Sequence, residues 1–198
     1  MKRLMLILLV FPIMGFSQVK LNEDSINYYF AQIVSEYRIG KNLNQVRVDK
    51  DYKYFTDNWS QYIYNLKQTK DSASYYKEYY SHGIGKTHFH KRADSIMYLE
   101  PCENAIETFD LTLPKIYDGY EFKNLTRSED ITYLKYVASK FGNNITNEDI
   151  AWYIFLIWKD SPKHNVVLLY PSTTRFYITT YVVGNKMTVS YLGLKDIY

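Results

Sequence analysis

Apolar residues recur at helical spacing in two segments near the start of the chain. In residues 24–39 they fall three or four positions apart and so lie on one helix face, and Gly40 follows them. Residues 52–66 repeat the spacing, with Asp49 or Asp51 ahead of them as a candidate N-cap. We therefore predict two helices, each with one buried face.

Two more helices are predicted in the second half of the chain. Residues 128–140 carry a narrow apolar stripe, which is typical of a surface helix. Thr146 and Asp149 form a capping-box pattern ahead of residues 150–158, which are all apolar or aromatic. A helix that is apolar all round is buried all round, and we expect the Ser-Pro pair at 161–162 to end it.

The C-terminal part of the chain has the composition of strands. Residues 165–170, 175–183 and 186–194 are rich in Val, Ile, Thr, Leu and Tyr, and Gly184-Asn185 is a tight connection between the last two. We predict strands here that end in an antiparallel hairpin. Helices followed by strands favour a single α+β domain whose helices stack on a sheet.

The start of the chain predicts a secretory signal peptide. Lys2 and Arg3 precede an apolar run of about eleven residues, and Gly15 and Ser17 supply the small side chains of a cleavage site. The run is too short to cross a bilayer comfortably. We expect residues 1–17 to be removed and the rest to be secreted or periplasmic, with no transmembrane segment.

Charge and cysteine content narrow the possible functions. The formal net charge is +3, and Lys2 and Arg3 supply two of these charges, so a basic surface for nucleic acid is not indicated. Cys102 is the only cysteine, which leaves core packing rather than an internal disulfide to hold the fold together. The 22 tyrosines fit half-buried positions and do not by themselves mark a ligand site.

Three of the four histidines lie in one polar stretch, between short helices predicted at 72–80 and 91–99. They are His82, His88 and His90. His88 and His90 would point the same way on a strand and, with a carboxylate, could hold zinc. A zinc site needs three or four ligands with partners behind them, and the alternative is that these histidines are solvated loop residues.

Two short polar segments beside apolar ones are further candidates for chemistry. PCENA contains Cys102 and Glu103, and WKDSPKHN contains His164. Cys102 could be a hydrolase nucleophile if a histidine and an oxyanion hole lie near it, or a small buried hydrophobe. Glu103 could instead be the N-terminal charge of a short helix beginning at Asn104, with His164 an exposed turn residue.

Taken in order, these features resemble the CAP superfamily, also called SCP or pathogenesis-related-1 domains, in its bacterial form. The helix containing VRVDKDYKYFTDNWSQYI, the histidine stretch and the Glu-Asn pair of CENA each have a counterpart there. The most specific match is the W-x-x-S-P-x-H pattern of Trp158, Ser161, Pro162 and His164, followed by strands. The resemblance covers most of residues 25–193.

The resemblance implies a three-layer α-β-α sandwich with a mainly antiparallel sheet. It would span residues 18–198 as one CAP-like domain, with an insertion around 112–145. The chain departs from the family in having no disulfides, in Ser161 where many eukaryotic members have a second glutamate, and in Phe176-Tyr177 where a Gly-x-Gly pattern is common. These departures affect the shape of the cleft and hence the ligand.

The resemblance also implies a site. It is an open cleft lined by His88, Glu103 and His164, with His82 and then His90 as alternative first histidines, and it could bind zinc or another divalent cation. The family is linked to extracellular binding, including sterols and other lipids. We therefore expect a secreted binding or interaction protein whose ligand is a divalent metal or a small apolar molecule. The alternative is a secreted peptidase or esterase that uses this cleft or Cys102.

Overall fold

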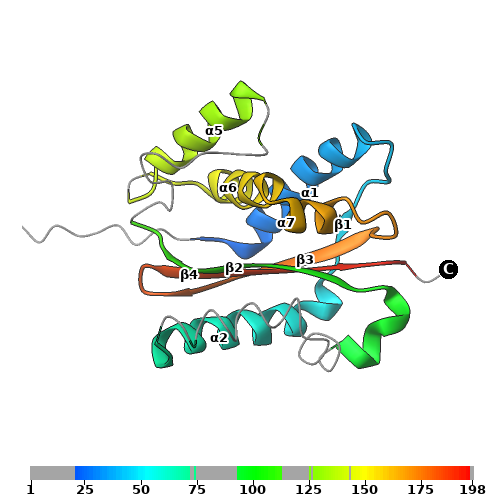
Figure 1. Ribbon diagram of the computed structural model, residues 1–198, viewed down its shortest axis with the longest axis horizontal. Coiled ribbons are helices and arrows are strands. Elements are labelled where there is room, and N and C mark those ends of the chain that lie inside the picture. Colours follow the sequence, from blue (N-terminus) through cyan, green and yellow to red (C-terminus); the bar gives the residue numbers. More distant parts are fainter. Residues whose placement is uncertain are drawn as a thin grey trace, which may run out of the picture.

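The structure is a computed structural model that describes residues 21–71, 74, 93–112, 125, 127–142 and 144–196. The predicted signal peptide, almost all of the helical piece at 72–80, and His82, His88 and His90 lie outside these residues. The described elements form a mixed α+β fold in which helices lie on both faces of a sheet (Figure 1).

Four strands form the described sheet, in the order β1-β3-β4-β2. Strands β2 (Cys102–Asp110), β4 (Lys186–Leu194) and β3 (Arg175–Val183) are antiparallel neighbours, and the short β1 (Arg47–Val48) runs parallel to β3. Gly184 lies in the turn between β3 and β4 with a φ of 58°, which glycine adopts without strain. The predicted C-terminal hairpin is confirmed.

One face of the sheet is covered by α1 (Glu23–Ile39), α6 (Asn147–Asp160) and the short α7 (Pro162–Leu168), and α5 (Ser128–Ser139) packs on α6. The other face is covered by α2 (Lys53–Thr69), which follows the 3-10 turn η1 (Lys50–Tyr52) (Figure 1). A second 3-10 turn, η2 (Asp94–Leu99), leads into β2. None of the helices in the described part of the chain is long and apolar enough to cross a membrane.

The strongly periodic segments form the helices that the sequence predicts. The structure confirms α1, α2, α5 and α6 within a few residues of the predicted bounds, and a 3-10 turn lies within the piece predicted at 91–99. The α6 helix runs through the main core, where the ring of Trp158 lies 5.7 Å from that of Phe30 and 5.8 Å from that of Tyr191. Trp158 is fully buried.

Two local predictions are wrong. Residues 165–170 were expected to be a strand, but α7 includes most of them, because Pro162 has the backbone angle of a first helical turn and starts a new helix directly after α6. The suggested short helix at Asn104 is part of β2 instead. Short apolar runs are compatible with either state, and pairing with β4 decides the outcome for β2.

The predicted capping box at the start of α6 is present and gives a test of how this helix is held. The Thr146 hydroxyl accepts a hydrogen bond from the Asp149 N–H at 3.1 Å, and the Asp149 carboxylate accepts one from the Thr146 N–H at 2.9 Å. We expect Thr146→Ala to lower the free energy of unfolding in urea by about 1 kcal/mol. Ser128→Ala, at the start of α5 where no side chain caps the helix, should change it by less than about 0.5 kcal/mol. Equal losses in the two variants would contradict this account of the cap.

Candidate functional site

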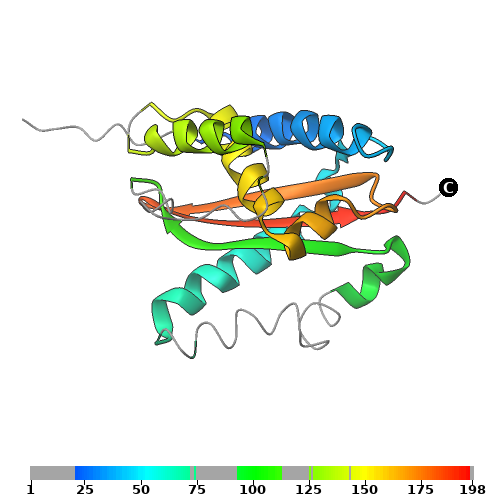
Figure 2. The same ribbon diagram turned by 45° about the horizontal axis from the view of Figure 1, so that its top comes forward.

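The two polar segments singled out in the sequence lie against each other. CENA begins β2, the outermost strand of the described sheet, and α7 crosses above it (Figure 2). The Asn104 side-chain amide donates a hydrogen bond to the main-chain carbonyl of His164 at 3.0 Å, although the two residues are 60 positions apart. Folding therefore brings the Glu-Asn pair and the Ser-Pro-x-His turn into direct contact.

The position of His164 follows from how α6 ends. The Trp158 ring packs between the rings of Phe30 on α1 and Tyr191 on β4, and this packing holds the last turn of α6 in place. Ser161 then takes an extended conformation, with φ −89° and ψ 114°, and Pro162 starts α7 in a new direction. His164 thus sits in the first turn of a short helix rather than in an exposed loop, and it is half-buried.

Side chains of β2 alternate between the two faces of the sheet. Cys102 packs on the core beneath α1 and α6, and Asn104 reaches α7 on that same face. Ala105 lies on the opposite face, in the cluster formed by residues of α2, and Glu103 must point the same way as Ala105. Glu103 therefore leaves β2 on the face opposite to α7, and a site shared by Glu103 and His164 would have to form around the outer edge of β2.

A buried arginine side chain holds the C-terminal end of α7 by hydrogen bonds. The Arg38 guanidinium is completely buried and donates hydrogen bonds to the carbonyls of Leu168 at 2.8 Å and Tyr170 at 3.1 Å. It also donates to the carbonyls of Thr173 at 2.8 Å and Asn44 at 2.8 Å. Burial lowers the pKa of Arg38, but a guanidinium remains charged at physiological pH. This single side chain joins the end of α1 to α7 and to the turn before β3.

Cys102 is partly buried and tightly packed next to this arginine network. Its sulfur is 3.3 Å from the Thr173 hydroxyl, and a Cβ at Gly193 would come within 2.7 Å of that sulfur and within 2.7 Å of the Tyr191 hydroxyl. Glycine is therefore required at 193 for strand β4 to approach Cys102. Burial raises the pKa of the Cys102 thiol to about 11, which keeps it protonated at neutral pH. Such a thiol suits packing rather than nucleophilic attack.

Sequence reasoning missed Arg38, although the spacing of the chain carried a signal for it. Ile26, Phe30 and Val34 follow one another at four-residue intervals on the buried face of α1, and the next position in that series is 38. A charged residue at a core-facing position has to find buried partners. The sequence could indicate that a buried arginine needs partners, but not that four carbonyls, one at Asn44 and three within residues 168–173, would supply them.

The predicted metal ligands are only partly within the described residues. Of the predicted ligands only Glu103 and His164 are described, and zinc requires three or four ligands. In the described ranges no group of three or more His, Cys, Asp or Glu side chains is placed to hold a metal ion. The metal prediction therefore depends on His88, or on His82 or His90 in its place, and all three lie outside the described residues.

No protein-family model matches the chain, and no curated protein matches it in sequence. The contacts between β2 and α7 and the chemistry of the residues there are therefore the features of this chain that point to a function.

The state of Cys102 can be tested by alkylation. At about pH 8, a thiol with a pKa of about 11 has a thiolate fraction at least about 100-fold smaller than an unfolded cysteine. We expect iodoacetamide to label Cys102 in the native protein at least about 100-fold more slowly than in denaturing urea. Lys135→Cys in a Cys102→Ala background, on the exposed side of α5, is the control and should react at similar rates in both states. Equal native and denatured rates for Cys102 would show that its thiol is accessible and ionisable.

Proposed function

We propose that the protein is a secreted or periplasmic binding protein of the CAP type. In this proposal its CAP-like cleft lies at the junction of β2 and α7 and binds a divalent cation such as zinc. Glu103, His164 and one upstream histidine, with His88 as the first choice and His82 as the second, are the ligands.

The arrangement of the elements supports the CAP-like part of the proposal. Three long strands pair in antiparallel fashion, and helices lie on both faces of the sheet, as a three-layer α-β-α sandwich requires. The Glu-Asn pair is in the outermost strand of the described sheet. The Trp-x-x-Ser-Pro-x-His pattern spans the junction of α6 and α7, and a β-hairpin follows it. This order is the one that the family resemblance implies.

The hydrogen bond from Asn104 to the His164 carbonyl is the observation that carries the proposal. It connects the two motifs that the resemblance pairs, and a chance similarity in sequence would give no reason for them to touch. The bond also fixes the first turn of α7 relative to β2. Fixing the backbone that carries His164 would lower the cost of holding its imidazole in place as a ligand.

The chemistry of the two described residues suits a divalent cation. The Nδ1 atom of His164 is buried, so Nε2 is the nitrogen through which this imidazole would bind. A glutamate oxygen and two neutral imidazoles make a common ligand set for zinc, with one position left for water or a ligand. With zinc bound, the cleft would recognise a partner whose oxygen or nitrogen atom can coordinate the metal at the open position.

A hydrolase is the second candidate, and the raised pKa of Cys102 argues against its thiol-dependent form. A thiol whose pKa is raised to about 11 is not a ready nucleophile. A hydrolytic role would then have to use the histidines and Glu103 as general acid and base, or a metal-bound water. Binding of a lipid or sterol rests on the family resemblance alone.

Zinc titration by calorimetry tests the metal site. We expect the parent protein to bind about one zinc ion per chain, and His164→Ala or Glu103→Gln to weaken binding by at least about tenfold, because each removes a ligand. His88→Ala and His82→Ala identify the third ligand, since only the true ligand should show the same loss.

Glu129→Gln is the matched control for Glu103→Gln. Glu129 is a highly exposed carboxylate on α5, away from β2, so its replacement should leave zinc affinity unchanged. No zinc binding by the parent protein, or equal binding by the parent and His164→Ala, would contradict the metal site.

A further inference from the structure

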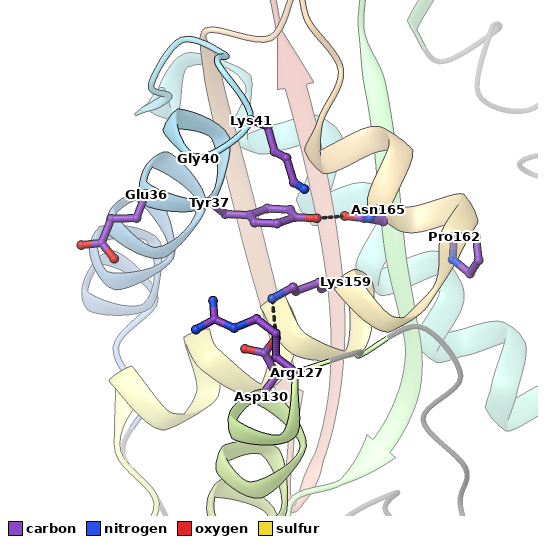
Figure 3. A pocket seen from close by; sticks show the side chains of 9 residues that line it. All are labelled: Glu36, Tyr37, Gly40, Lys41, Arg127, Asp130, Lys159, Pro162 and Asn165. Atoms are coloured by element: carbon purple, nitrogen blue, oxygen red, sulfur yellow. Dashed lines mark hydrogen bonds and ion pairs between the residues drawn. The ribbon is translucent and has the colours of Figure 1, made fainter.

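A groove of about 510 Å³ opens on the helical layer, away from the junction of β2 and the His164 carbonyl. It lies between the end of α1, the start of α5, the end of α6 and the start of α7 (Figure 3). Helix α7 contributes Pro162 and Asn165 to it. The groove thus shares a helix with the proposed metal site but none of its residues.

Positive charge predominates among the side chains that line this groove. Lys41 follows α1, Arg127 precedes α5 and Lys159 lies in α6, and Asp130 of α5 provides a carboxylate among them. Glu36 also lines the groove, but its carboxylate is directed away from the other charged groups (Figure 3). Asp130 offsets the charge of Lys159, which leaves Lys41 and the solvent-exposed Arg127 as the cations that a ligand could engage.

The centre of the groove is preorganised. The Lys159 ammonium donates to the Asp130 carboxylate at 2.6 Å and lies 5.2 Å from the centre of the Tyr37 ring. Both members of this ion pair are largely buried, with side chains 16% and 15% exposed. The pair therefore keeps a fixed geometry and leaves further ammonium hydrogens for an anion.

A second contact in the groove orients the side-chain amide of Asn165, which is a neutral hydrogen-bond donor. The Tyr37 hydroxyl donates a hydrogen bond to Asn165 Oδ1 at 3.1 Å (Figure 3). With its oxygen occupied in this way, the Asn165 side chain offers its NH₂ group as a donor. Lys41 reaches toward the same pair of residues in Figure 3.

Arg127 adds a further hydrogen-bond donor at the solvent-exposed rim of the groove. It pairs with Glu129 at 3.0 Å, but these side chains are 68% and 77% exposed. An ion pair in water at this exposure contributes little, so the guanidinium can turn to a ligand at small cost. A guanidinium also binds two oxygens of one phosphate at once, which an ammonium does not.

We propose that this groove binds the phosphate group of a small phosphomonoester. Lys41 and Arg127, whose pairing with Glu129 is weak because it is exposed, supply positive charge for an anion. Donors from the turn after α1, from α6, from α7 and from the residue before α5 suit the several oxygens of a tetrahedral group. The volume exceeds that of a phosphate group and lies within the usual range of small-molecule sites. The organic part of the ligand would extend along Tyr37.

Phenyl phosphate is the probe for this site. We expect the purified protein to bind it in calorimetry at about pH 8, with EDTA present so that the proposed metal site is empty. At this pH the phosphate is a dianion. Lys41→Gln and Arg127→Gln should each weaken binding about five- to tenfold through loss of a charge-assisted hydrogen bond. Phenyl sulfate, a monoanion of similar shape, should bind more weakly than phenyl phosphate.

Lys163→Gln is the matched control, because Lys163 is an exposed lysine of α7 that does not line the groove. It should leave the affinity for phenyl phosphate within about twofold of the parent. No binding of phenyl phosphate, equal binding of phenyl sulfate, or an equal loss in Lys163→Gln would overturn the proposal. Because EDTA is present throughout, none of these outcomes depends on the zinc site.

Discussion

The buried guanidinium of Arg38 determines where α7 lies. Taking a charged group out of water costs several kcal/mol, and no carboxylate in the described residues forms an ion pair with it. Its hydrogen bonds to four main-chain carbonyls offset that cost, because bonds from a charged donor are about twice as strong as neutral ones. Two of these carbonyls, those of Leu168 and Tyr170, belong to the end of α7 and the residues just after it.

Helix α7 is thus held at both ends, and both candidate sites depend on this. Trp158 fixes the end of α6 from which α7 starts, and Arg38 fixes the other end. Between them the His164 carbonyl meets Asn104 of β2, while Asn165 meets Tyr37 of α1. A helix of seven residues is marginal by itself, so these tertiary contacts rather than helix propensity keep it in place.

The sequence predicts the long periodic elements well, because spacing over four turns or a capping box such as that of Thr146 depends on local chemistry alone. It does not predict α7, since a short run rich in Val and Leu fits strand or helix equally. The contact between CENA and His164 was expected only from a family resemblance. Glu103 and Asn104 point to opposite faces of the sheet because they are consecutive residues of a strand. This could be predicted only if CENA were known to be a strand. The groove combines residues from four elements, none of which is unusual alone.

Native-state hydrogen exchange in Arg38→Lys tests this account most directly. Lysine keeps the charge but cannot reach four carbonyls in the planar geometry of a guanidinium. The amides of residues 165–169 should lose protection by at least about tenfold more than those in the middle of α6, because the far end of α7 is released while the core remains. Equal changes in α7 and α6, or full protection of α7 in the variant, would contradict the claim that Arg38 holds this helix in place.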